Sequence, residues 1–204
     1  MKMTDIVLAS ASPRRREILT TLGVRFRVVV SGADEDVSGA ASPEEYVLQA
    51  AKRKNEAVLA RLKEDASITP DTLIIACDTV VVYNGVVIGK PPDEPHAILT
   101  LGMLSDSWHS VLSGLSVYYH GRTAGTVART EVKFRELSEA EILAYVESGE
   151  PMGKAGSYAI QQKGASFAEP IEGDFYNVVG LPVAALLALL RSEFGITSLD
   201  IMNF

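Results

Sequence analysis

The apolar run Leu73-Ile74-Ile75-Ala76-Cys77 has the length and composition of a buried strand. It belongs to a longer stretch, residues 72–89, in which an Asn84-Gly85 pair separates two apolar segments. This pattern predicts a strand, a tight turn and a second strand, because Asn-Gly readily adopts the positive φ angles of a two-residue hairpin turn. Asp78 and Thr79 directly follow the apolar run, so we expect them where the buried strand ends.

A carboxylate at the end of a buried strand suits two kinds of chemistry. It can hold Mg²⁺, or it can activate a water molecule. Taken alone, Asp78 is equally well interpreted as an ordinary residue of a turn or strand end. Cys77 is the only cysteine, so no internal disulfide can form and a thiolate zinc site is disfavoured. We expect a core thiol there rather than a nucleophile, since free cysteine packs as a small hydrophobic residue.

Further elements flank this hairpin on both sides. We expect strands at residues 5–10, 25–30, 107–119 and 123–135, the last two as an antiparallel pair, a short strand within 154–164, and helices at 13–23, 42–62, 95–104, 138–148 and 182–194. Strands and helices do not alternate as in a regular βαβ series, and neither a GxGxxG nor a P-loop motif is present. The sequence therefore predicts a mixed α/β fold with long strands.

The run Ser10-Ala11-Ser12-Pro13-Arg14-Arg15-Arg16 follows the first predicted strand. Ser12 is suited to cap a helix and Pro13 to begin it. The unpaired N–H groups and the dipole of a helix N-terminus attract anions, and Ser10 and Ser12 add hydroxyl donors. Three arginines in a first turn oppose that dipole, which makes sense if a bound anion neutralises them. The alternative is a solvated basic helix face.

Composition narrows the class of ligand. Of the 204 residues, 47% are apolar and 22% are charged, as in an ordinary globular protein, and the formal net charge is −7. An acidic chain is poorly suited to bind a nucleic acid polymer, so the arginine cluster indicates a small anion. Neither a signal peptide nor an apolar run of about 18 residues is present, so we expect a cytoplasmic protein with no membrane partner.

Other polar segments are weaker candidates when taken singly. The loop Asp34-Glu35-Asp36 could supply oxygen ligands to a cation, and Lys54 and Lys90 could each meet a phosphate as a point charge. In the segment 153–161, small residues would let a ligand approach the backbone, and the Gln161 amide could read a base edge. Each segment is also what a solvated loop or helix contains. The three histidines, His96, His109 and His120, lack the spacing of metal ligands.

Taken together and in order, these motifs resemble one family. The resemblance rests on Ser10–Arg15, Lys54, Ala76-Cys77-Asp78-Thr79-Val80, Gly89-Lys90-Pro91, Ser148-Gly149-Glu150-Pro151, Lys154–Gln161 and Asn177–Pro182. The chain is similar to the Maf-family nucleoside triphosphate pyrophosphatases, once described as septum-formation inhibitors. The resemblance implies a single domain over residues 1–204. It also implies an elongated mixed sheet with flanking helices and two dependent lobes around a central cleft, similar to the inosine triphosphate pyrophosphatases.

The same resemblance implies hydrolysis of a nucleoside triphosphate to the monophosphate and pyrophosphate with Mg²⁺ or Mn²⁺. Asp78 resembles the family's proton acceptor, and Glu35 resembles the acidic loop residue near the metal. We expect Asp78 and Glu35 together to hold the metal ion. By the same resemblance, Arg14, Thr79 and Gln161 are the positions tied to base selection, and Ser12, Arg15, Lys54 and Lys90 are the phosphate-contacting set. We expect Ser10, a hydroxyl donor beside them, to bind substrate as well. The Tyr158-Ala159-Ile160-Gln161 version of the loop accompanies dTTP and UTP preference, with modified pyrimidine nucleotides as further candidates.

Two departures and two alternatives accompany this expectation. Gln162 and Lys163 stand where the family usually has a glycine after the glutamine, and Asp34 or Asp36 could share the role of Glu35. A catalytically weak nucleotide-binding regulator linked to cell division is the first alternative. An RNA-binding module is the second, and the net charge disfavours it. The resemblance further implies a homodimer.

Overall fold

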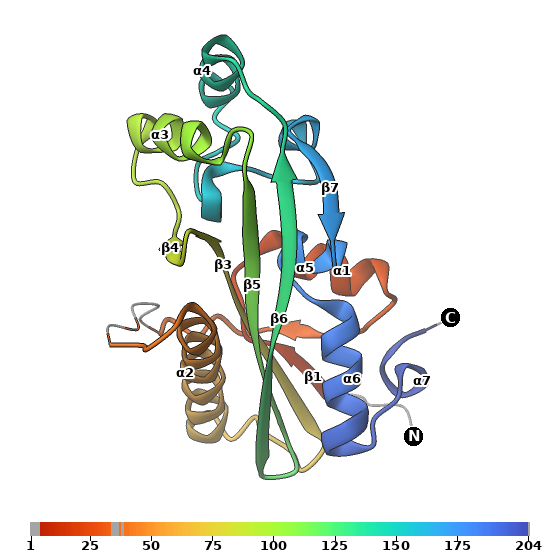
Figure 1. Cartoon of the computed structure of the whole chain (residues 1–204). Coiled ribbons are helices and arrows are strands. Elements are labelled where there is room, and N and C mark those ends of the chain that lie inside the picture. Colours follow the sequence, from red (N-terminus) through yellow and green to blue (C-terminus); the bar gives the residue numbers. More distant parts are fainter. Residues whose placement is uncertain (1–4, 34–36, 38, 204) are drawn as a thin grey trace. The chain divides into compact units, whose positions relative to one another are not determined.

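The computed structural model describes residues 5–33, 37 and 39–203. Sixteen helices and strands follow one another along this part of the chain (Figure 1). They are β1 (Asp5–Leu8), α1 (Pro13–Thr21), β2 (Arg27–Val28), α2 (Pro43–Glu64), β3 (Thr72–Tyr83), β4 (Val86–Ile88), α3 (Glu94–Leu104), β5 (Trp108–Tyr119), β6 (Arg122–Phe134), α4 (Glu139–Glu147), the 3₁₀ turns η1 (Ala155–Ser157) and η2 (Lys163–Ser166), β7 (Ala168–Glu172), α5 (Phe175–Val179), α6 (Val183–Phe194) and α7 (Ser198–Ile201).

The strands of the described chain form one mixed sheet in the order β2-β1-β3-β5-β6-β7, with β4 paired to β3. β1 runs parallel to both β2 and β3, whereas β4 and β7 pair antiparallel with β3 and β6. β5 and β6 are neighbours joined by two residues, a connection that only antiparallel strands allow. The expected mixed α/β sheet with flanking helices is thus confirmed.

The chain divides into two compact units. Unit 1 comprises Met1–Asp78, Ser113–Ala128 and Gly180–Phe204, and unit 2 comprises Thr79–Leu112 and Arg129–Val179. β3, β5 and β6 contribute residues to both units. None of the helices in the described residues is long and apolar enough to cross a membrane.

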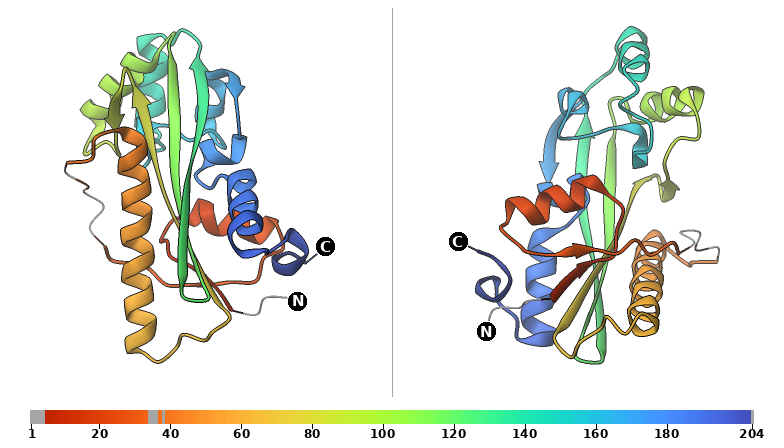
Figure 2. Two further views of the ribbon diagram at one scale, coloured as in Figure 1. Left: turned by 60° about the horizontal axis from the view of Figure 1, so that its bottom comes forward. Right: turned by 180° about the vertical axis from the view of Figure 1, so that it is seen from behind.

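In unit 1, α2 and α6 lie on opposite faces of the strands (Figures 1 and 2). On the α2 face, Val58 and Leu62 pack with Val7 and Ile74 in a fully buried cluster. The α2 backbone also approaches β5 very closely at Gly114, because a Cβ atom built on that glycine would lie 2.1 Å from the Val47 carbonyl oxygen. This close contact fixes the helix that carries Lys54.

A buried amide ties the same helix to the sheet. The Asn55 side chain is 1% exposed, and its Nδ2 donates to the Ser116 carbonyl at 2.9 Å and to the Ile74 carbonyl at 3.4 Å. These carbonyls belong to β5 and β3. Asn55 therefore sets the rotation of α2, and with it the direction of the adjacent Lys54.

In unit 2, aromatic rings form the centre of the core. Phe134 packs edge-on against His109 and Tyr158, each with ring centroids 4.8 Å apart, and Phe167 packs against Tyr145 at the same separation. α3 contacts both α4 and η1. The segment around η1 and η2, residues 154–166, is thereby anchored to this core through Tyr158 and Phe167.

The structure corrects three expectations about strands. Residues 25–30 form only the two-residue β2, which pairs with Val7 and Leu8 and ends where its partner β1 ends. The segment 154–164 holds no strand, since Gly156 and Ser157 have φ angles of 69° and 61°, which a strand does not allow. β3 does not end near Asp78 but continues to Tyr83, where the Asn84-Gly85 turn begins with φ angles of 49° and 77°.

The remaining elements follow the expected pattern closely. The helices expected at 13–23, 42–62, 95–104, 138–148 and 182–194 correspond to α1, α2, α3, α4 and α6, and the Ser12, Ser42 and Ser138 side chains cap the first, second and fourth of these. β7, α5 and α7 were not expected. The acidic loop residues Asp34, Glu35 and Asp36 lie outside the described residues.

Candidate active site

The candidate site in unit 1 begins with a buried ion pair. Lys54 Nζ donates to Asp78 Oδ1 at 2.6 Å, and the two side chains are only 6% and 11% exposed. Lys54 lies on α2 and Asp78 on β3, so the pair joins the helix to the sheet. A carboxylate so far from bulk water is stabilised mainly by the ammonium group beside it.

The N-terminus of α1 lies close to this pair because β1 and β3 run parallel. β1 pairs with β3 up to Leu8 and Ile75, and the Ala9 N–H donates to the Ile75 carbonyl at 2.8 Å. The chain therefore leaves β1 at the level where β3 reaches Cys77 and Asp78. This register delivers the serines and arginines of the N-terminal run to the end of β1 nearest the carboxylate.

Arg15 anchors the start of α1. It is 8% exposed, its Nε donates to the Gly180 carbonyl at 2.8 Å, and its Nη1 donates to Ser10 Oγ at 3.0 Å. The Cys77 thiol lies 3.5 Å from the same Gly180 carbonyl. The Gly180 carbonyl, in the segment before α6, thus joins Arg15 of α1 to Cys77, the β3 residue that precedes Asp78. Cys77 is fully buried, as expected of a core thiol.

The other two arginines of the run differ from Arg15. Arg14 is half-buried, its Nε has no hydrogen-bond partner, and burial, followed by the nearby Arg15 charge, lowers the pKa of its guanidinium group. An unpaired buried donor of this kind is costly unless a ligand satisfies it. Arg16 is exposed. Ser12 accepts the Arg15 N–H at 3.5 Å as the helix cap.

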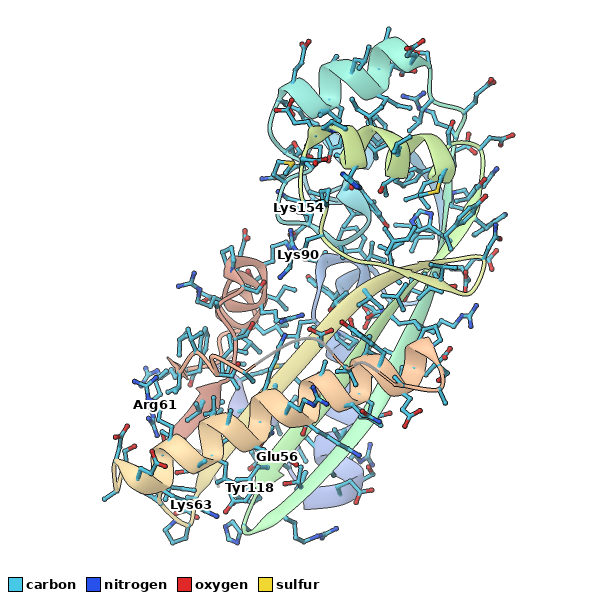
Figure 3. The ribbon with its side chains drawn as sticks, turned by 90° about the vertical axis from the view of Figure 1, so that its left-hand side faces the viewer. Glu56, Arg61, Lys63, Lys90, Tyr118 and Lys154 are labelled. Carbon is cyan, nitrogen blue, oxygen red and sulfur yellow. The ribbon has the colours of Figure 1, made fainter. Side chains whose placement is uncertain are left out.

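Unit 2 carries three of the expected site residues. Thr79 follows Asp78 in β3 and is half-buried, whereas Lys90 and Gln161 are exposed. The Gly156 N–H donates to the Gly89 carbonyl at 3.1 Å, which joins the segment of Lys90 to that of Lys154, and Figure 3 shows both lysines in this region. Lys154 Nζ donates to the Glu150 carbonyl at 2.5 Å.

Within residues 5–33, 37 and 39–203, no group of three or more His, Cys, Asp or Glu side chains could hold a metal ion. His96 and His120 are exposed, and His109 is buried against Tyr158. Asp78 is a hard oxygen donor, which suits a cation that takes only one or two carboxylates and completes its shell with substrate phosphates and water.

The profile of the Maf-like protein family matches residues 5–193. The chain belongs to this family. It is 42% identical over 189 residues to the dTTP/UTP pyrophosphatase of Neisseria gonorrhoeae, covering 93% of this chain and 94% of the relative. It is 45% identical over 195 residues to the dTTP/UTP pyrophosphatase of Pelotomaculum thermopropionicum, covering 95% and 98%.

Among solved structures, this Maf-like chain is similar to the Staphylococcus aureus Ham1 protein. The TM-score is 0.42 at 14% identity, over 64% of this chain and 72% of the other.

Sequence reasoning missed three groups that shape the site. The Gly180 carbonyl, and the side chains of Tyr145 and Glu150, hold the segments that carry Arg15 and Gln161. Gly180 and Glu150 stand in two of the motifs that carried the resemblance, Asn177–Pro182 and Ser148–Pro151, but received no role. Because these two motifs had no assigned chemistry, a structural role for them was the inference that could have found Gly180 and Glu150. The Tyr145 hydroxyl had none, because a tyrosine on an apolar helix face is ordinary core.

Proposed function

We propose that this chain hydrolyses nucleoside triphosphates, dTTP and UTP foremost, to the nucleoside monophosphate and pyrophosphate. The names of the relatives, which are 42% and 45% identical over nearly the whole chain, support this activity. The observation that carries it is the buried Lys54–Asp78 pair at the level of an arginine-rich helix N-terminus. A carboxylate there is suited to activate water, and the cations are suited to bind a polyphosphate.

In the proposed reaction, Asp78 accepts a proton from a water molecule as that water attacks the α-phosphorus. The new P–O bond forms as the bond from the α-phosphorus to the bridging oxygen breaks, and pyrophosphate leaves with that oxygen. Lys54, which donates to Asp78, is proposed to stabilise the negative charge of the phosphate oxygens through its positive charge. Catalysis would then rest on positioning and electrostatic stabilisation, as is usual in phosphoryl transfer.

In this proposal the phosphates of the substrate are bound by the N–H groups that begin α1 and by the side chains of Ser10, Ser12, Arg14, Lys54 and Lys90. The unpaired Arg14 Nε supports this assignment, because an anion would satisfy it. Arg15 stays in the proposed substrate-contacting set, but its bonds to Gly180 and Ser10 indicate an anchoring role as well. Thr79 and Gln161 are proposed to select the base, together with Arg14, which keeps this role beside its phosphate contact.

The proposed cofactor is Mg²⁺ or Mn²⁺. Asp78 would hold it together with Glu35, which lies outside the described residues, and the triphosphate would supply further oxygen ligands. When bound, such a cation neutralises charge on the phosphates and orients them. We therefore expect the cation to bind tightly only when the nucleotide is bound, and hydrolysis to require both.

Replacing Asp78 tests the proposal. Asp78→Asn removes the proton acceptor but keeps an oxygen that can accept from Lys54, so we expect pyrophosphate release from dTTP with Mg²⁺ to fall by at least about 10²-fold, as is typical for loss of a general base. Asp65→Asn is the matched control, because Asp65 is exposed and pairs only loosely with Arg61 at 3.8 Å. Near-normal dTTP hydrolysis by a folded Asp78→Asn variant would refute the assignment.

A further inference from the structure

Gln161 lies in a tight turn of unit 2. The Gln162 N–H donates to the Ala159 carbonyl at 3.1 Å, so Ile160 and Gln161 occupy the two central positions of a four-residue turn. Ile160 is buried, and Gln161 is exposed. The direction in which the Gln161 amide is presented is therefore set by what holds the base of this turn.

The Tyr145 hydroxyl holds the base of the turn on its N-terminal side. It accepts the Ala159 N–H at 3.1 Å and donates to Glu150 Oε1 at 2.9 Å. The tyrosine is 5% exposed and packs edge-on against Phe167, which fixes its ring. Burial, and then the adjacent Glu150 carboxylate, raise the pKa of Tyr145, so its hydroxyl keeps the proton that it donates.

The Glu150 carboxylate holds the other side. Its Oε1 accepts the Gly164 N–H at 3.0 Å, and its Oε2 accepts the Lys163 N–H at 3.2 Å. Glu150 is delivered to this place by the end of α4, where Ser148 Oγ donates to the Tyr145 carbonyl at 2.7 Å and Gly149 turns the chain with a φ of 71°. The motif Ser148-Gly149-Glu150-Pro151 therefore encodes a helix end followed by a clamp.

Gly164 allows the two sides of the clamp to meet. A Cβ atom built on it would lie 2.8 Å from the Tyr145 hydroxyl oxygen and 2.9 Å from the Ala159 carbonyl oxygen. Only a glycine fits this space without displacing one of those groups. The base of the turn is thus held by the side chains of Tyr145 and Glu150, and it can close because Gly164 has no side chain.

We propose that Tyr145 and Glu150 are positioning residues that determine base selectivity by fixing where the Gln161 amide is presented. A side-chain amide has a donor and an acceptor, and rotation by about 180° lets it pair with a keto or an amino pyrimidine edge. Selectivity for the keto base of dTTP over the amino base of dCTP then requires a backbone that does not shift. This inference rests on the proposed triphosphate hydrolysis.

Two substitutions open the clamp without touching Gln161, Asp78 or Lys54. Tyr145→Phe leaves the buried Ala159 N–H without an acceptor, and Glu150→Ala releases the Lys163 and Gly164 N–H groups. For each we expect the ratio of kcat/KM for dTTP to that for dCTP to fall about tenfold, the effect of one hydrogen bond of ordinary strength. The fall arises mainly from a higher KM for dTTP, with kcat changed by less than about twofold.

Three further variants separate positioning from general stability. Glu150→Gln keeps one acceptor oxygen, so its ratio falls less than that of Glu150→Ala. Tyr176→Phe and Glu147→Gln, at exposed tyrosine and glutamate side chains, are the matched controls and keep the wild-type ratio. A merely structural clamp would lower the thermal midpoint of Tyr145→Phe and leave its ratio unchanged, which would overturn the inference.

Backbone amide exchange gives a second readout that does not depend on activity. Exchange of the Ala159 and Gly164 N–H groups is expected to accelerate about tenfold in Tyr145→Phe and Glu150→Ala, respectively, and unchanged rates contradict the clamp. A wild-type enzyme that hydrolyses dTTP and dCTP equally also overturns the selectivity inference. Wild-type protein that releases no pyrophosphate from any nucleotide overturns the proposed function instead.

Discussion

The Lys54–Asp78 pair costs free energy unless both partners are present. Its two side chains are almost completely buried, and the charges lie 2.6 Å apart. Removal of one member takes the closest opposite charge away from the other in a poorly solvated place, whereas removal of both removes both charges. Single and double substitutions at this pair can therefore distinguish its effect on the free energy of unfolding from its effect on activity.

We expect Lys54→Met and Asp78→Leu each to lower the free energy of unfolding by about 3 kcal/mol or more, because each breaks a buried ion pair by removing one of its members. The double variant is expected to regain most of that loss and to remain inactive. Urea denaturation of the four proteins measures the cycle, and pyrophosphate release from dTTP measures the activity. Additive losses in the double variant would show that the two charges do not interact.

Single residues also show how far sequence reasoning extends into the site. The resemblance named Asp78 and Lys54, yet the spacing of 24 residues between them gives no sign that they touch. Arg15 was grouped with Arg14 because the two are neighbours in sequence. Helix geometry turns adjacent residues by about 100°, so one guanidinium group is buried against Gly180 and the other has an unpaired Nε.

At the scale of elements, the sequence predicted what local signals specify. The helices with Ser-Pro or Ser-x-x-Glu starts, α1, α2 and α4, were found with boundaries close to those observed. The failures were at elements set by tertiary contacts. β2 pairs with only the last two residues of β1, and the segment 154–166 follows the Tyr145–Glu150 clamp rather than its own propensity. α5 and α7 have five and four residues, too few for a periodic pattern.

The approach of α2 to β5 is a property of elements that a single atom can test. Gly114→Ala places a Cβ atom against the α2 backbone at Val47, which no side-chain movement can relieve. We expect a loss of about 1–3 kcal/mol in the free energy of unfolding and a loss of dTTP hydrolysis, because the helix that is displaced carries Lys54. Thermal or urea unfolding and the pyrophosphate assay measure the two effects.

Gly102→Ala is the matched control for this substitution. Gly102 lies within α3, is exposed, and would place its Cβ atom in open space. Because alanine has a higher helix propensity than glycine, we expect a gain of about 0.5–1 kcal/mol with activity unchanged. Equal stability losses in the two variants would mean that the α2–β5 contact is not tight.

At the scale of the whole molecule, one buried histidine makes global stability depend on pH. His109 is 2% exposed and its Nε2 lies 2.9 Å from the Tyr158 hydroxyl. Burial lowers the pKa of His109 from 6.5 to about 4, and the Glu131 charge opposes this shift only in part. Between these two values the unfolded chain binds a proton that the folded chain does not. The contribution of His109 to stability is therefore complete above pH 6.5 and is lost as the pH falls toward 4.

Integrated from pH 6.5 to 4, the lowered pKa of His109 corresponds to a loss of about 3 kcal/mol in the free energy of unfolding. Hydrogen bonds from Arg135 and Ser138 lower the pKa of Glu141 to about 2, so this carboxylate also makes stability fall in acid. The contribution of His109 is therefore obtained by comparing wild type with a variant that lacks the histidine. We expect the free energy of unfolding, from urea titrations between pH 7.5 and 4.5, to fall less steeply for His109→Asn than for wild type. His120→Asn, at an exposed histidine, should retain the wild-type slope. Parallel slopes for wild type and His109→Asn would mean that the imidazole is protonated equally in the folded and unfolded chains.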